Sequence, residues 1–154
     1  MAKRLDALGF ETRRVSFTRP PRGDLAPHMD DVRRARHELR CEKVALVGRS
    51  FGGRVCTRLA ASEPPDALVL LGHPISPPNR PRPEDEAALA AVNCPTFIVQ
   101  GERDVLGPLN VLQRIARVNR AIEIYVLAGV GHQFGARQND GLDHAAEWLV
   151  KVLG

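Results

Sequence analysis

The sequence has no long hydrophobic run, few cysteines and few aromatic residues. A membrane-spanning helix needs about 20 consecutive apolar residues, and no segment approaches that length. The first residues are basic but contain no apolar stretch, so they do not resemble a signal peptide. The three cysteines, Cys41, Cys56 and Cys94, have unrelated spacings and no metal-ligand spacing with a histidine. They fit a reducing compartment better than a disulfide framework, so we expect a cytoplasmic protein with no membrane partner and no metal site.

The chain also lacks the features of a nucleic-acid binder, although its net charge is +4. The positive charge is concentrated in residues 1–60 and is carried mostly by arginine. Within the predicted helix 28–39, and at Arg40 just beyond it, arginines alternate with acidic residues and no aromatic residues are interleaved for base stacking. This pattern is typical of a solvated helix face, and we expect no nucleic-acid partner.

The 154 residues, of which 44% are hydrophobic, predict one domain spanning 1–154. Apolar runs alternate with segments of helical spacing, which indicates a mostly parallel sheet with helices on both faces, the α/β class. About five strands are expected. They are 11–17, 44–47, 67–71, 96–100 and 122–127, and helices are expected over 1–8, 28–39, 84–92, 109–118 and 142–153, with one more directly after Ser50.

The most informative stretch is Gly48-Arg49-Ser50-Phe51-Gly52, which matches the pattern G-x-S-x-G. It follows a short apolar run and precedes a segment of helical spacing, as in a nucleophile elbow. The turn is sharp, so we expect both outer glycines to be required where strand and helix nearly touch. The serine hydroxyl would then project above the sheet, with the Phe51 N–H as an oxyanion donor. The alternative is a glycine-rich turn with an inert serine.

Three predicted strands end in residues that can act together. Ser50, Asp104 and His132 each follow a strand and a glycine, and the carboxyl ends of parallel strands lie at one edge of a sheet. A serine hydroxyl needs an imidazole to accept its proton, and the imidazole needs a carboxylate on its other nitrogen. Glu102 is the alternative acid. Taken singly, Asp104 could cap a helix and His132 could be a structural loop residue.

These motifs resemble the α/β-hydrolase superfamily over the whole chain. The matching stretches are Gly48 to Gly53, Gly101-Glu-Arg-Asp104 and Gly131-His132-Gln-Phe134, and the loop 71–78 resembles a small branch related to dienelactone-hydrolase-like proteins. The resemblance implies hydrolysis of a small-molecule ester or thioester through an acyl-enzyme, without a cofactor. It implies Ser50 as nucleophile, His132 as general base and Asp104 as orienting acid. Dienelactone hydrolases proper have cysteine where this chain has Ser50, so their substrate is not implied.

One departure from the family concerns the segment before the predicted helix 1–8. The family has a strand there that ends in a loop with a second oxyanion donor, and this chain has neither. The resemblance therefore predicts either a gap in the sheet between 11–17 and 43–48 or direct pairing of the two. It also suggests that the natural protein starts upstream of Met1. Unpaired strand edges could pair with a second copy, giving a homo-oligomer.

The remaining candidates are less specific. Arg49, His73 and Phe134 are expected to line the substrate pocket, whereas His28, His37 and His144 are expected to be structural. Two other functions stay open. A phosphate or nucleotide binder is disfavoured because residues 48–54 match neither G-x-x-x-x-G-K-[ST] nor G-x-G-x-x-G. A catalytically impaired interaction protein with the same fold is the stronger alternative, because of the missing oxyanion loop.

Overall fold

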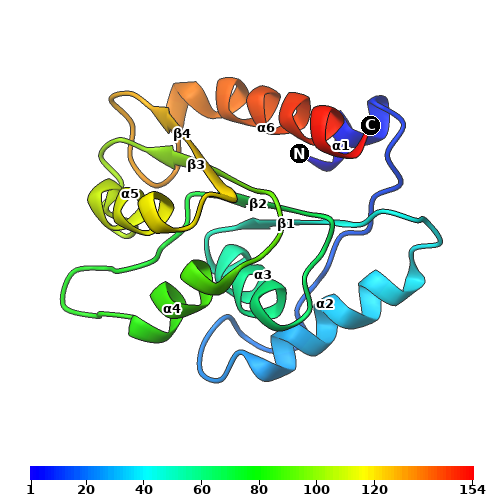
Figure 1. Ribbon diagram of the computed structural model, residues 1–154, viewed down its shortest axis with the longest axis horizontal. Coiled ribbons are helices and arrows are strands. Elements are labelled where there is room, and N and C mark those ends of the chain that lie inside the picture. The colour runs from blue at the N-terminus through cyan, green and yellow to red at the C-terminus, as the bar shows by residue number, and fades with distance from the viewer.

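The computed structural model describes residues 1–154 and is built around a parallel four-stranded sheet of order β1-β2-β3-β4 (Figure 1). The strands are β1 (Ala45–Arg49), β2 (Ala67–Leu71), β3 (Thr96–Gly101) and β4 (Ile122–Leu127). Each strand pairs with the next one along the chain, with helices in the crossovers, and strands β2 and β3 are buried along their whole length. All four strands therefore end at the same edge of the sheet.

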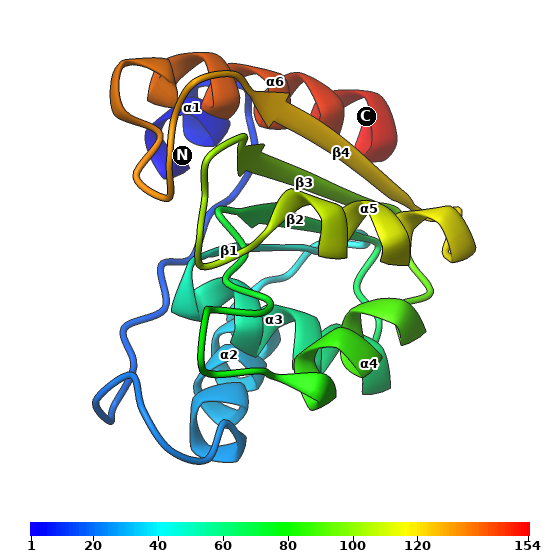
Figure 2. The ribbon, with the colours of Figure 1, turned by 90° about the vertical axis from the view of Figure 1, so that its left-hand side faces the viewer.

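Helices cover both faces of the sheet (Figures 1 and 2). α1 and α6 lie on one face, and α2 to α5 lie on the other. The helices are α1 (Ala2–Ala7), α2 (Ala26–Glu38), α3 (Phe51–Ser62), α4 (Pro83–Ala91), α5 (Leu109–Val118) and α6 (Gln138–Leu153), with a short 3₁₀ turn η1 (Gly135–Arg137) before α6. None of them is long and apolar enough to cross a bilayer.

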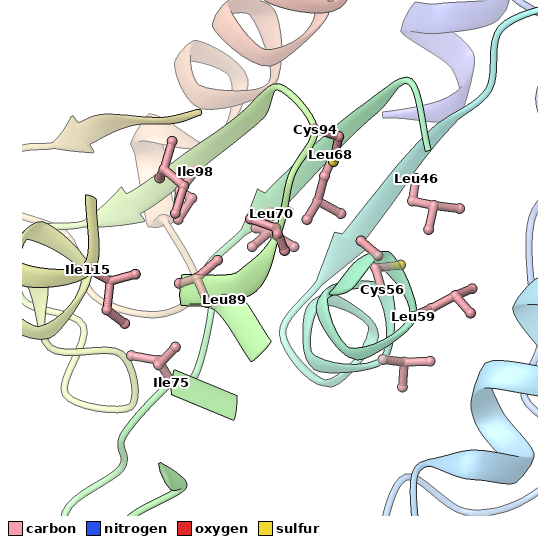
Figure 3. Packing of buried hydrophobic residues seen from close by; sticks show 14 of the residues in the cluster. Leu46, Cys56, Leu59, Leu68, Leu70, Ile75, Leu89, Cys94, Ile98 and Ile115 are labelled. Atoms are coloured by element: carbon pink, nitrogen blue, oxygen red, sulfur yellow. The ribbon is translucent and has the colours of Figure 1, made fainter. Parts of the chain in front are cut away.

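Alternate side chains of the strands supply two separate cores. In β2, Leu68 and Leu70 face the side of α2 to α5, where they pack with residues such as Leu59 and Leu89 (Figure 3). The intervening residues of the same strand face α6 and pack with Trp148 and others. Period-two alternation on a sheet buried on both faces explains why 67–71 is a continuous apolar run.

The predicted strand 11–17 is wrong. This segment has no regular secondary structure, and its backbone makes no hydrogen bond to another backbone group. A β-strand needs a neighbouring strand to which its backbone can hydrogen-bond. Segment 10–17 has none, because a cleft of about 700 Å³ separates it from the open edge of β1. Val15 and Phe17 still pack against the core through their side chains. Of the two predicted alternatives, the structure has the gap and not direct pairing.

The other predicted elements are present with small shifts at their ends. α2 begins two residues earlier than expected, with Pro27 in its first turn, where a missing N–H does no harm. α6 begins at Gln138, four residues before the predicted start at Leu142. The intervening residues Gln138 to Gly141 are mostly polar, so the apolar periodicity used for the prediction did not include the first turn of α6.

Candidate active site

Ser50 lies on a sharp turn between β1, which ends at Arg49, and α3, which begins at Phe51. Its backbone has φ 49° and ψ −118°, a conformation that non-glycine residues rarely adopt. Gly48 permits the turn, because a Cβ built on it would lie 2.6 Å from the Gly52 carbonyl oxygen. The strain is held by the packed strand and helix on either side, as is typical of a functional residue.

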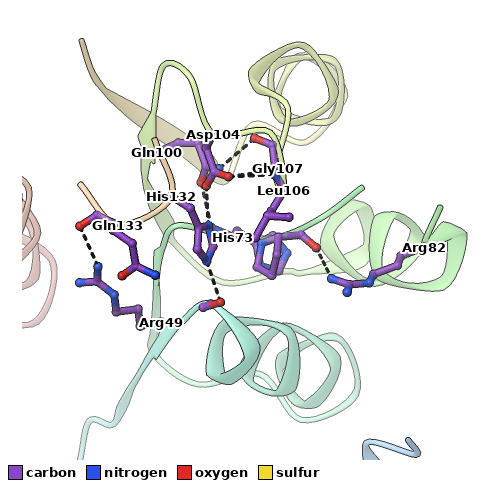
Figure 4. A network of polar contacts seen from close by, with 11 residues as sticks. Arg49, His73, Arg82, Gln100, Asp104, Leu106, Gly107, His132 and Gln133 are labelled. Atoms are coloured by element: carbon purple, nitrogen blue, oxygen red, sulfur yellow. Dashed lines mark hydrogen bonds and ion pairs between the residues drawn. The ribbon is translucent and has the colours of Figure 1, made fainter. Parts of the chain in front are cut away.

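Ser50, His132 and Asp104 meet at the carboxyl edge of the sheet. The Ser50 Oγ lies 2.8 Å from the Nε2 of His132, and the Nδ1 of His132 lies 2.8 Å from the Oδ2 of Asp104 (Figure 4). Because a carboxylate only accepts, His132 Nδ1 carries the hydrogen and Nε2 is free to accept the Ser50 proton. The sequence-predicted convergence of three distant residues is thus present in the structure.

The carboxylate of Asp104 has no exposed surface and is held by several donors. Its Oδ1 accepts hydrogen bonds from the backbone N–H groups of Leu106 at 2.9 Å and Gly107 at 3.3 Å. Such bonds compensate for the burial of a charge. The other predicted acid, Glu102, is exposed and accepts from the Gly129 N–H at 2.7 Å, away from His132. Of the two predicted acids, only Asp104 contacts His132.

Arg49 joins the serine turn to the loop that carries His132. Its Nη2 donates to the Gln133 carbonyl at 3.2 Å (Figure 4). Its Nη1 donates to Gln138 Oε1 at 3.2 Å. Its guanidinium also lies 5.0 Å from the ring centroid of Phe134. Phe134 is buried with a φ of 63°, so the loop makes a tight turn directly after the histidine. These contacts tie His132 to the turn that carries Ser50.

The cleft beside β1 reaches Ser50 at one end. Its lining includes Arg49, Ser50 and Phe51, and segment 10–17 forms its opposite wall. Phe51 is the first residue of α3, so its N–H has no intrahelical partner and is available to an oxyanion. The Phe51 ring also packs edge-on against Phe17 and His28, with centroids 5.5 and 4.9 Å away. This aromatic contact fixes the start of α3.

His73 and Phe134, two of the predicted pocket residues, do not line this cleft. His73 is fully buried, and neither of its ring nitrogens has a hydrogen-bond partner. Burial is the main cause that lowers the pKa of His73 to about 4, with smaller contributions from Arg54 and Arg82 against Asp85. At neutral pH the imidazole is therefore uncharged. Only Arg49 of the three pocket candidates borders the cleft.

The described chain contains no group of three or more His, Cys, Asp or Glu side chains that could hold a metal ion. The three cysteines are free; Cys41 is exposed, and Cys56 and Cys94 are buried. Burial raises the pKa of the Cys56 thiol to about 12, so this residue stays protonated. None of the three is placed as a nucleophile at the site.

Sequence reasoning missed two buried polar residues near the site. Gln100, in β3, contacts Asp104, and its signal was a polar residue directly after the apolar run 97–99. Asp85, in α4, accepts from Arg54 of α3 at 2.5 Å and from Arg58 at 3.4 Å. No pattern distinguished Asp85 from the exposed acids beside it in the first turn of α4.

A family model described as "Alpha/beta hydrolase domain" matches residues 11–152. The chain belongs to the α/β-hydrolase family. No curated protein matches it. Among solved structures, this α/β hydrolase is similar to a serine hydrolase homologue from Coxiella burnetii, at 25% identity and a TM-score of 0.68. The match covers 99% of this chain and 74% of that one.

Two further structures share the fold of this α/β hydrolase. One, assigned to the α/β superfamily, is from Xanthomonas campestris, with 23% identity, a TM-score of 0.73 and coverage of 97% of this chain and 87% of that one. The other is a monoacylglycerol lipase from Paleococcus ferrophilus, with 13% identity, a TM-score of 0.71 and coverage of 84% and 76%. The four-stranded sheet and its helices are thus those of an α/β hydrolase, and this class of fold was predicted from the sequence.

Proposed function

We propose that this α/β hydrolase is a serine hydrolase that cleaves a small carboxylic ester or thioester through an acyl-enzyme. The observation that carries the proposal is the continuous hydrogen-bonded chain from Ser50 through His132 to Asp104, with both links at 2.8 Å. Each residue type and each contact suits one step of acyl transfer. The described residues offer no arrangement that suits metal-assisted hydrolysis equally well.

In the first half-reaction, the Ser50 Oγ attacks the carbonyl carbon of the ester and its proton passes to His132 Nε2. The carbonyl oxygen becomes an oxyanion that accepts a hydrogen bond from the Phe51 N–H. The bond to the leaving group then breaks, and His132 gives its proton to the departing oxygen or sulfur. In the second half, water attacks the acyl-enzyme by the same steps, with His132 again as base, and releases the acid and free Ser50.

Asp104 contributes by holding His132 in the productive tautomer. Its Oδ2 accepts the Nδ1 hydrogen, so Nε2 faces Ser50 with a free lone pair. The carboxylate also stabilises the imidazolium that forms in each half-reaction. The ester-type substrate would approach from the cleft that Ser50, Phe51 and Arg49 border. The dienelactone-hydrolase-like branch remains a proposal that rests on the loop 71–78.

A fluorophosphonate probe tests this function, because such probes phosphonylate only activated serines. We expect the wild-type protein to be labelled and the Ser50→Ala variant to remain unlabelled. Hydrolysis of p-nitrophenyl acetate should fall by about 10³-fold or more in the same variant. Ser62→Ala, at the far end of α3, is the matched control and should be labelled as the wild type is.

The alternative function is a catalytically impaired interaction protein with the same fold. Absence of labelling and of hydrolysis in the folded wild-type protein would support it. Labelling that survives in Ser50→Ala would place the reactive group elsewhere and would also contradict the proposed mechanism. The probe therefore separates the two functions directly.

A further inference from the structure

Gln100 is a fully buried amide that contacts the acid of the triad. It lies near the carboxyl end of β3, four residues before Asp104, and has no exposed surface. Its Nε2 donates to Asp104 Oδ2 at 2.8 Å and to the Gly107 carbonyl at 2.9 Å, while its Oε1 accepts from the His73 N–H at 2.8 Å (Figure 4). Both amide hydrogens and the amide oxygen are therefore used.

The partners allow only one orientation of this amide. The His73 N–H can only donate, so it must face the oxygen, and the Gly107 carbonyl can only accept, so it must face the nitrogen. The nitrogen is then fixed beside Asp104. The loop packs closely around the amide, because a Cβ built on Gly107 would lie 2.5 Å from Gln100 Nε2.

The bond from Gln100 determines how Asp104 meets His132. Oδ2 of Asp104 has one contact with Gln100 Nε2 and one with His132 Nδ1, both at 2.8 Å. Oδ1 is occupied by the backbone donors of Leu106 and Gly107. Rotation of the carboxylate would break bonds on both oxygens, so the lone pair that faces His132 is fixed before substrate arrives.

We propose that Gln100 is a positioning residue of the hydrolase site, which acts through Asp104 by fixing the oxygen that receives the His132 hydrogen. The expected effect of Gln100 on the rate rests on the proposed function. The expected effect of Gln100 on the geometry of Asp104 and His132 rests on the structure alone. Gln100 touches neither substrate nor Ser50, so its loss changes kcat and leaves KM nearly unchanged. Through its bonds to His73 and Gly107, Gln100 also links the end of β2 to the loop after β3.

Gln100→Met keeps the side-chain length and removes all three hydrogen bonds. We expect kcat for p-nitrophenyl acetate to fall by about 10- to 100-fold, the range measured for partners that orient metal ligands, with KM within about twofold. The control is Thr96→Val at the amino end of β3, which removes a buried hydroxyl that donates to the carbonyl of Cys94, just before the strand, at 2.9 Å. That variant should keep kcat within about twofold.

Gln100→Glu gives a readout that a merely structural role would not move. The introduced carboxyl keeps the acceptor for the His73 N–H, and while protonated it can still donate to Asp104. Burial and the neighbouring carboxylate keep it protonated to a higher pH than usual, but on ionising it repels Asp104. We expect kcat to decline with rising pH over a range in which the wild-type rate is flat. A profile parallel to that of the wild type would overturn the proposal.

A proton NMR spectrum separates failure of this inference from failure of the proposed function. The hydrogen shared by His132 Nδ1 and Asp104 gives a downfield imidazole resonance whether or not the protein hydrolyses esters. We expect that resonance in the wild type and in Thr96→Val, and its loss or marked shift in Gln100→Met. An unchanged resonance in folded Gln100→Met would refute the positioning role. Presence of the resonance in a wild-type protein that the probe does not label would keep the geometry and reject the activity.

Discussion

At the scale of single residues, His73 has an unusual position for a titratable group. It is fully buried, neither ring nitrogen is hydrogen-bonded, and burial lowers its pKa to about 4. An unfolded chain would bind a proton at this residue near its ordinary value of 6.5. Between these two pH values the unfolded state therefore holds more protons than the folded state, and the free energy of unfolding falls as the pH falls.

The prediction is that His73 destabilises the fold at acidic pH. The free energy of unfolding has its full value above about pH 6.5. It falls by on the order of 3 kcal/mol between about pH 6.5 and 4, from the size of the pKa shift of His73. His73→Leu removes the titration and an unpaired polar group, so its stability should equal or exceed that of the wild type at pH 7. Urea unfolding at pH 4.5 and 7 measures both effects. An equal pH dependence in the two proteins would contradict the assignment.

At the scale of an element, the turn from β1 to α3 places different demands on its two outer glycines. A Cβ on Gly48 would meet the Gly52 carbonyl oxygen at 2.6 Å, whereas a Cβ on Gly52 would meet nothing within 4 Å. The prediction that both outer glycines of G-x-S-x-G are required for close packing is therefore wrong for Gly52. Gly53 is the second crowded position, with His73 Nδ1 3.3 Å from its built Cβ.

The two glycines give a matched pair of variants. Gly48→Ala should lower the free energy of unfolding by roughly 1–3 kcal/mol, because the added methyl group has no room and the strand must move. It should also displace Ser50 and reduce probe labelling. Gly52→Ala should be neutral or more stable by up to about 1 kcal/mol, since alanine favours the helix. Thermal unfolding and labelling rates measure the pair. Equal losses in both variants would mean that the turn geometry differs from that described.

The same elements show what the sequence could and could not predict. Strands 67–71 and 122–127 were predicted with their observed ends. The first is a short apolar run closed by Gly72, and the second is rich in β-branched and aromatic residues, which favour a strand. The convergence of Ser50, Asp104 and His132 followed from parallel topology, since all strand ends share one edge. Gln100 was not predicted, because its role depends on which carbonyl and which N–H lie around it in space. The prediction of a strand over 11–17 was wrong because a strand forms only where a neighbouring strand can hydrogen-bond to it.

At the scale of the whole molecule, the open edge of β1 is the main irregularity of the fold. The Val44 carbonyl and the Ser50 N–H bond to the β2 side, and the direction of these groups alternates along a strand. The N–H groups of Ala45, Val47 and Arg49 therefore face the cleft that separates β1 from 10–17. In β2, by contrast, strands flank both sides, so every amide has a neighbour.

This asymmetry predicts an uneven pattern of amide hydrogen exchange across the sheet. The amides of Ala45 and Val47 should exchange faster than those of Val69 and Leu71 by at least about 100-fold, because local opening suffices for the first pair and near-global unfolding is needed for the second. Exchange followed by NMR on the native protein measures this. Slow exchange of Ala45 at every protein concentration would mean that the edge is paired within the chain. Protection that grows with protein concentration would instead show that two copies pair through β1, the homo-oligomer that an unpaired edge allows.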